Sequence, residues 1–165
     1  MTYPFTLPEQ FKIVDATAGA VTTNGGVTAD YVNLAYCHKA YIVVQLTQAA
    51  AHATAIAIRQ ATSAAGASVK AIANAVEIWA NEATGTSDAL VRQTAAVSYT
   101  VTADIAKKLV IFEIDPAKLD LANGFDYLNF TVADSSEATN FVAATYILVS
   151  RYPQASVPGG PSVIS

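Results

Sequence analysis

The stretch KLVIFEIDP at residues 108–116 is the most informative part of this 165-residue chain. Side chains of an extended strand alternate between two faces. One face of this strand carries Val110, Phe112 and Ile114, and the other carries Leu109 and Ile111. Because both faces are apolar, the strand needs cover on two sides. Proline cannot continue a sheet ladder, so the strand is predicted to end before residue 116.

Similar β-branched and aromatic runs recur along the chain, with Ala, Gly, Ser, Asn and Thr between them. They lie at residues 41–46, 54–59, 126–132 and 140–151. Strands separated by turn residues in this way predict an all-β fold, an antiparallel β-sandwich for which a jelly roll is one possible form. A helical turn is predicted after Pro116, over residues 116–120. The alanine-rich residues 63–75 are interrupted by Gly66, which favours a loop followed by a strand at 69–72 over a helix.

The last strand is also apolar on both faces. One face carries Val142, Ala144, Tyr146 and Leu148, and the other carries Phe141, Ile147 and Val149. Two kinds of cover are open: a second layer of the same chain, such as the N-terminal segment lying across the sheet, or a neighbouring subunit. The two can both hold.

The chain is predicted to fold as one domain with an extended arm at each end. Residues 1–28 contain Pro4, Pro8 and the turn signal Asn24-Gly25-Gly26, so we expect an arm with at most one strand, at 11–14. Residues 29–152 form the predicted β-sandwich. Residues 153–165 hold three prolines and two glycines, and this composition predicts an extended tail.

Composition excludes several classes of function. The net charge is −4, the isoelectric point is near 4.9 and the nine basic residues are scattered, which argues against a nucleic-acid-binding surface. Lys107 and Lys108 are the adjacent pair, and we interpret them as a solvated entrance to the strand. With 53% hydrophobic and only 13% charged residues, much of the surface must be neutral.

The ends and the cysteine content favour a soluble protein that is not exported. The N-terminus lacks the basic start and continuous apolar core of a signal peptide. No apolar stretch approaches the roughly 20 residues of a membrane helix. The single cysteine, Cys37, cannot form an intrachain disulfide, which fits synthesis in a reducing cytoplasm.

Residues with catalytic or metal-binding chemistry are few. Cys37 and His38 are neighbours and point to opposite faces of a strand, and His52 lies beyond its other end, so neither a metal site nor a nucleophilic pair is favoured. The carboxylates Glu77, Glu82 and Asp88 would be the candidates for a small hydrolase. The tryptophan beside them is expected to be an anchor in the core or in an interface.

Three further carboxylates, Asp115, Asp120 and Asp126, flank a turn but lack the spacing of a calcium loop, so turn and capping roles are expected for them. Nucleotide-binding and hydrolase motifs are also missing from the sequence. We therefore expect no catalytic residue, no cofactor and no metal. The triplet Asn129-Phe130-Thr131 matches a glycosylation acceptor, but it lies within a predicted strand.

Several segments resemble a family of tailed-bacteriophage virion proteins, the capsid cement or decoration proteins. The resemblance covers roughly residues 30–152 and rests on strand and turn patterns. The segments that carry it are residues 38–44, 58–62, 77–82, 108–116, 124–128, 144–148 and 151–152.

The resemblance implies a β-sandwich with a structural role in the virion and no catalytic residues. Its partners would be the major capsid protein and further copies of the chain, with no nucleic acid and no membrane. The protein would be made in the bacterial cytoplasm and would lie on the capsid surface. Candidate interface residues from the apolar ends and the tryptophan are Phe5, Leu7, Trp79, Val157, Val163 and Ile164.

Two other functions stay open from the sequence. A carbohydrate- or receptor-binding sandwich of a phage head fibre or tail would gain support from an aromatic platform among Tyr31, Tyr36, Trp79 and Tyr99. A hydrolase would gain support from a carboxylate with a strongly raised pKa in a deep cleft.

Overall fold

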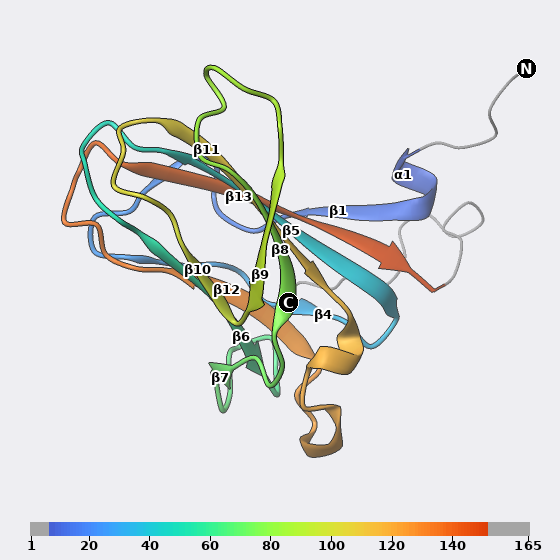
Figure 1. The fold of residues 1–165 in the computed structure, drawn as a ribbon. Coiled ribbons are helices and arrows are strands. Elements are labelled where there is room, and N and C mark those ends of the chain that lie inside the picture. The colour runs from blue at the N-terminus through green and yellow to red at the C-terminus, as the bar shows by residue number, and fades with distance from the viewer. Residues whose placement is uncertain (1–6, 152–165) are drawn as a thin grey trace, which may run out of the picture.

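The computed structural model describes residues 7–151, except for the side chains of Glu9 and Gln10. Helix is confined there to one short α-helical turn and two 3-10 turns, and the remaining regular structure is β-strand (Figure 1). In chain order the elements are α1 (Leu7–Gln10), β1 (Phe11–Asp15), β2 (Val21–Thr22), β3 (Val27–Thr28), β4 (Val32–Asn33), β5 (Cys37–Thr47), β6 (Ala55–Ala61), β7 (Lys70–Ala71), β8 (Val76–Asn81), β9 (Val91–Ala96), β10 (Ser98–Thr100), β11 (Lys107–Ile114), η1 (Pro116–Lys118), η2 (Leu121–Asn123), β12 (Tyr127–Val132) and β13 (Phe141–Ser150).

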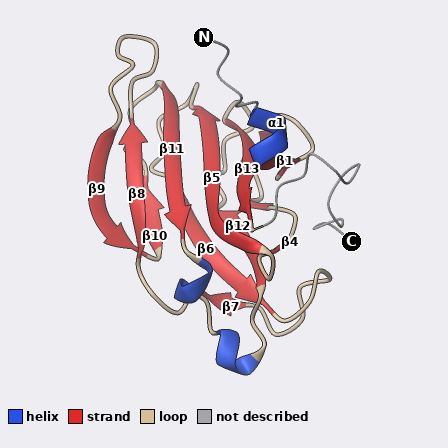
Figure 2. Ribbon diagram, turned by 90° about the vertical axis from the view of Figure 1, so that its right-hand side faces the viewer, coloured by secondary structure: helices blue, strands red, loops and turns tan. Residues whose placement is uncertain are grey.

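The strands form two antiparallel sheets that pack face to face, which confirms the predicted β-sandwich. The seven-stranded sheet has the order β1-β13-β5-β11-β8-β9, with β2 paired to β13. Figure 2 shows these long strands side by side. The six-stranded sheet has the order β10-β6-β12-β3, with β4 on β12 and β7 on β6. Because β11, β12 and β13 lie alternately in the two sheets, each long connection crosses the sandwich.

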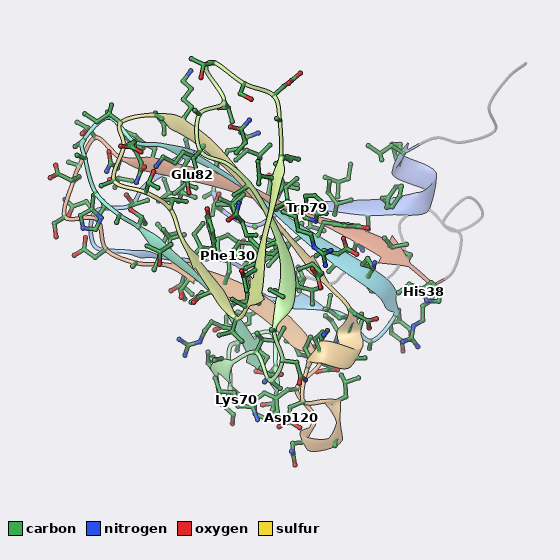
Figure 3. The ribbon with its side chains drawn as sticks, viewed as in Figure 1. His38, Lys70, Trp79, Glu82, Asp120 and Phe130 are labelled. Carbon is green, nitrogen blue, oxygen red and sulfur yellow. The ribbon has the colours of Figure 1, made fainter. Side chains whose placement is uncertain are left out.

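The core consists of one alternating set of side chains from each long strand. In β5 the buried members include Ile42, Val44 and Leu46, while their neighbours along the strand are partly exposed or exposed. The Tyr146 ring packs edge-on against Phe130 of the other sheet, with ring centroids 6.1 Å apart. The Tyr146 hydroxyl donates to the carbonyl of Asp30 at 2.8 Å, so this buried polar atom is satisfied. Phe130 lies between the two sheets in Figure 3.

Most strands lie where the sequence predicts them, and each of the five apolar runs overlaps a long strand. The helical turn after the proline is confirmed as η1, whose first amide groups are capped by Asp115, which accepts from the Ala117 N–H at 2.8 Å. The alanine-rich segment is a loop followed by β7, as predicted. The strands β4, β8, β9 and β10 were not predicted. VRQTAA of β9 and SYT of β10 are too polar to show a strand pattern.

The expectation of at most one strand before residue 28 is wrong. β1, β2 and β3 all lie there, with β1 and β2 on β13 and β3 on β12. Val14 of β1 and Ala16 beside it are buried in the core. Residues 11–28 are therefore part of both sheets. Two-residue strands such as β2 and β3 have too few positions to show alternation in a sequence.

The interpretation of Lys108 as a solvated residue is also wrong. It takes the inward parity of β11, like Val110 and Phe112, and its side chain is fully buried. The ammonium uses all three donors: it lies 2.9 Å from the Glu82 carboxylate and donates to the carbonyl and hydroxyl of Thr102 at 2.6 and 2.7 Å. A buried ammonium with three partners is tolerated. Lys107, with the opposite parity, is exposed.

Glu82 is the centre of this buried network. Its other partner is the Tyr99 hydroxyl, which donates at 2.7 Å from β10, so the network links the two sheets at one edge. Burial raises the pKa of Glu82, but the hydrogen bonds from Lys108, Tyr99 and Thr102 outweigh it and the pKa is lowered. Burial, followed by the bond to Glu82, raises the pKa of Tyr99. Glu82 is therefore held as a carboxylate.

Replacing Glu82 by glutamine is expected to lower the free energy of unfolding by about 3 kcal/mol at pH 7, since Lys108 would keep a buried charge without a carboxylate. A lowered folded-state pKa stabilises the fold above the ordinary value of 4.5 and stops doing so as the pH falls through the folded value. Urea unfolding should therefore show the difference between native protein and Glu82→Gln narrowing below pH 4.5.

The matched control is Glu77→Gln. Glu77 and its partner Arg92 are 42% and 61% exposed, and an exposed pair contributes less than about 1 kcal/mol. A Glu82→Gln effect no larger than that of Glu77→Gln, or one independent of pH, would contradict the structural role given to Glu82.

Candidate protein-binding surface

The outer face of the seven-stranded sheet is the candidate site. It is formed by the strand positions that do not enter the core, and the described elements do not cover it. Its apolar side chains on β1, β13, β5, β11 and β8 are partly or well exposed: Phe11, Ile13, Phe141, Ala143, Ile147, Val149, Tyr41, Val43, Leu109, Ile111 and Trp79. An antiparallel sheet that faces water normally carries polar residues at such positions. This surface is called the outer apolar face below.

Strand register arranges these side chains in rows across the sheet. Thr145 lies opposite Val43, Val43 opposite Ile111, and Ile111 opposite Trp79. The row continues to Asp15 at the β1 end and to Arg92 at the β9 end. The row is therefore apolar across three strands, β5, β11 and β8, with Thr145 beside them on β13, and its two ends are oppositely charged.

The size of the outer apolar face follows from sheet geometry. Five adjacent strands about 4.8 Å apart, and about eight residue steps of about 3.3 Å along β5, cover roughly 24 Å by 27 Å, or about 650 Å². This area includes polar positions such as Lys39, Gln45 and Glu113, so the apolar part of the face is smaller. A cluster of exposed apolar side chains rimmed by polar residues is nevertheless a mark of an interaction site.

Four charged side chains on this face, Lys39, Glu113, Glu77 and Arg92, are paired within the chain. Lys39 forms an ion pair with Glu113, and Arg92 lies 2.5 Å from the carboxylate of Glu77. The hydrogen bond that Lys39 donates to the Glu113 carboxylate raises the pKa of Lys39, which keeps the ammonium charged. A partner that covers the face would therefore meet few unpaired charges, and desolvation would cost less.

The face is hollowed where its side chains are small. A depression of about 120 Å³ is lined by Asp15, Thr17, Gly19, Val43, Gln45, Ala143, Ala144 and Thr145. A second depression, of about 400 Å³, lies at one end of the face between Gln45, Lys107 and Thr84. The first is lined by small and polar side chains together with Val43 and the Asp15 carboxylate, so a side chain of a partner could enter it.

Trp79 lies on this face and not in the core. It has the outward parity of β8, where Val76, Ile78 and Ala80 are buried, and its side chain is only partly buried. The core alternative for Trp79 is therefore wrong, whereas the interface alternative stays a prediction. The sequence did hold a signal for this position: Trp79 alternates along the strand with Val76, Ile78 and Ala80, so it takes the face opposite to theirs.

Of the other candidate interface residues, the structure describes Leu7 alone. Leu7 lies in α1 and is 47% exposed. Phe5, Val157, Val163 and Ile164 lie outside the described residues. The sequence analysis recognised the apolar runs that carry Ile111, Ile147 and the pair Tyr41 and Val43, but it assigned side chains to two separate faces only for the first two runs.

The carboxylates considered for hydrolysis do not meet in one site. Glu77 pairs with Arg92 on the outer face, and Glu82 belongs to the buried network with Lys108. Asp88 is exposed in the loop between β8 and β9. The lowered pKa of Glu82 is opposite to the raised pKa that a general acid requires.

The remaining polar candidates have structural partners. Asp120 accepts from Lys70 at 2.5 Å and from Asn123, and these bonds lower its pKa (Figure 3). Burial raises the pKa of the Cys37 thiol, which disfavours a nucleophilic thiolate. His38 is exposed at the start of β5 (Figure 3). Within residues 7–151 no three His, Cys, Asp or Glu side chains are grouped to hold a metal ion. None of the helices described there is long and apolar enough to cross a membrane.

The four aromatics considered for a sugar platform are not assembled. Trp79 lies on the outer face of the seven-stranded sheet, and Tyr99 points from β10 to Glu82. Tyr31 packs on Gly66 of the loop before β7: a Cβ at that glycine would lie 2.7 Å from the tyrosine hydroxyl. Tyr36 is 61% exposed in the turn before β5. Each ring therefore has a separate environment.

Comparison with known proteins gives no family. No protein-family model and no curated protein sequence matches the chain. Among solved structures it is similar to the SPBc2 prophage-derived protein YomS, with 14% identity and a TM-score of 0.48 over 85% of this chain and 93% of that one. It is also similar to the structure of infectious bursal disease virus Gt strain, with 9% identity and a TM-score of 0.23 over 94% of this chain and 44% of that one. Likenesses this low do not carry an argument about the role of the chain.

Replacing Phe112 by alanine is expected to cost about 3–5 kcal/mol of unfolding free energy, because its ring is fully buried between the sheets. Trp79→Ala is expected to cost about 1 kcal/mol or less in dilute protein, since the partly exposed ring fills no core space. Equilibrium urea unfolding at low micromolar concentration measures both. Equal losses at the two positions would mean that Trp79 belongs to the core.

Proposed function

We propose that the chain is a non-enzymatic structural protein of a tailed-bacteriophage virion, which binds and stabilises the capsid shell as a cement or decoration protein. The observation that carries the proposal is the outer apolar face, a surface of about 650 Å² built by five strands. The resemblance of residues 30–152 to virion proteins is the reason for proposing a virion as the assembly. The exposed apolar surface is the physical reason for proposing that the chain assembles.

The energetic argument rests on apolar area. Removing apolar surface from water is worth about 25 cal/mol per Å². The isolated chain leaves Tyr41, Val43, Ile111 and Ile147 partly in water, whereas a neighbouring subunit would cover them. Because Lys39, Glu113, Glu77 and Arg92 are paired within the chain, that cover would not leave these four charges without partners.

The proposed partners are the major capsid protein and further copies of this chain, on the outside of the capsid. Glu77 and Glu82, two of the three carboxylates considered for hydrolysis, are held by Arg92 and Lys108, which is the kind of engagement expected of structural residues. The apolar ends, with Phe5, Val157 and Ile164, are the proposed attachment to the shell. They lie outside the described residues.

Quantitative mass spectrometry of purified virions should find the chain at a fixed ratio to the major capsid protein. Deleting residues 153–165 should leave the free protein folded but lower its retention on capsids under heat or chaotrope, because the apolar tips of the tail would be lost. The matched control keeps the length of the tail and replaces Val157, Val163 and Ile164 by serine; it should be released like the deletion. A chain absent from virions would overturn the proposal, and full retention of both variants would overturn the role of the tail.

A further inference from the structure

The outer apolar face has a self-complementary row of side chains. Across the sheet the row reads Asp15, Thr145, Val43, Ile111, Trp79 and Arg92. The six strands that carry it are β1, β13, β5, β11, β8 and β9, in that order. The row ends in the Asp15 carboxylate on β1 and in the Arg92 guanidinium on β9. The hollow lies at β13, next to β1, and Trp79 lies on β8, next to β9.

A two-fold axis parallel to the strands, placed over the boundary between β5 and β11, exchanges the two halves of this row. It brings β13 of one copy over β8 of the other, and β1 over β9. Rotation about such an axis preserves the position along the strands, so residues of one row meet residues of the same row. Sheets that pack face to face keep their strand directions within about 30° of each other, so this geometry is an ordinary one.

The contacts that result are complementary. Trp79 would enter the partner copy's hollow of about 120 Å³, beside Ala143 and Thr145. Val43 would lie over Ile111, and Asp15 over Arg92. Both charged side chains are exposed in the single chain. A guanidinium has five donors and can bind a second carboxylate beside that of Glu77.

We propose that the outer apolar face binds a second copy of this chain, in a two-fold dimer with Trp79 of each copy in the hollow beside Ala143 and Thr145 of the other and Asp15 of each paired with Arg92 of the other. This dimer rests on the proposed function, because it uses the same outer apolar face and states which protein covers it. Its area of about 650 Å² is near the roughly 800 Å² per partner of a standard interface. A tryptophan anchor in a pocket with an arginine pair beside it is the usual composition of an interface hot spot.

Charge exchange tests the geometry directly. In Asp15→Arg homodimers two guanidinium groups would face each other, and in Arg92→Asp homodimers two carboxylates would, so each variant should dimerise at least ~30-fold more weakly than the native chain. In an equimolar mixture the dimer of one copy of each variant would have both contacts attractive. Sedimentation velocity of the mixture should therefore recover a dimer that neither variant forms alone.

The single tryptophan is a second readout. Emission of Trp79 should move to shorter wavelength as native protein is concentrated, and the same shift should follow mixing of the two charge variants. Asp104→Arg, with the same charge change at an exposed loop position outside the row of contacts, is the control and should dimerise like the native chain. Circular dichroism and thermal unfolding check that each variant is folded.

A native chain that stays monomeric up to about 100 μM, or a dimer unaffected by both charge variants, would overturn the inference. A mixture that behaves as the sum of its parts would overturn it too, even if each variant alone is monomeric. These outcomes are separate from those of the virion measurements: a chain that is monomeric in solution and present on capsids would leave the proposed function standing and remove the dimer.

Discussion

The alternation of side chains along the long strands is the constraint on which the whole structure depends. One parity of β5, β11 and β13 builds the core, where Phe112 and Tyr146 are buried against the six-stranded sheet. The other parity points outward whatever its chemistry, because neighbouring residues of a strand cannot share a face. A register shift of one residue would exchange the two sets. The outer apolar face is therefore a direct consequence of strands whose two parities are both hydrophobic.

The same constraint explains how much of the structure could be predicted from the sequence. Long strands were predictable because runs such as residues 108–114 and 141–150 are apolar and β-branched over many positions. The parity of Trp79 was also available, since three buried residues of β8 alternate with it. The pairing of strands that are far apart in the sequence could not be predicted. The joining of β1 and β2 to β13 depends on partners more than 100 residues away, which a local pattern does not encode.

Lys108 shows a different limit of sequence reasoning. A lysine at the start of a strand is normally solvated. The alternation of the strand placed Lys108 on the inward face with Val110 and Phe112, but its charge favoured solvent. The structure resolves the conflict through Glu82, which follows β8, and through Tyr99 and Thr102, which lie in and just after β10. Only the fold brings these groups together. The candidate surface, by contrast, could be predicted in part. Its outward-facing apolar residues were recognised on two strands before any partner strand was known.

The central claim is that the outer apolar face is covered by protein where this chain functions. The most direct measurement is a cryo-electron microscopy reconstruction of the virion at a resolution that shows side chains. The account predicts protein density packed against Val43, Ile111 and Trp79, on the side of the seven-stranded sheet away from the core. A subunit whose outer apolar face is turned to solvent on the assembled particle would contradict it.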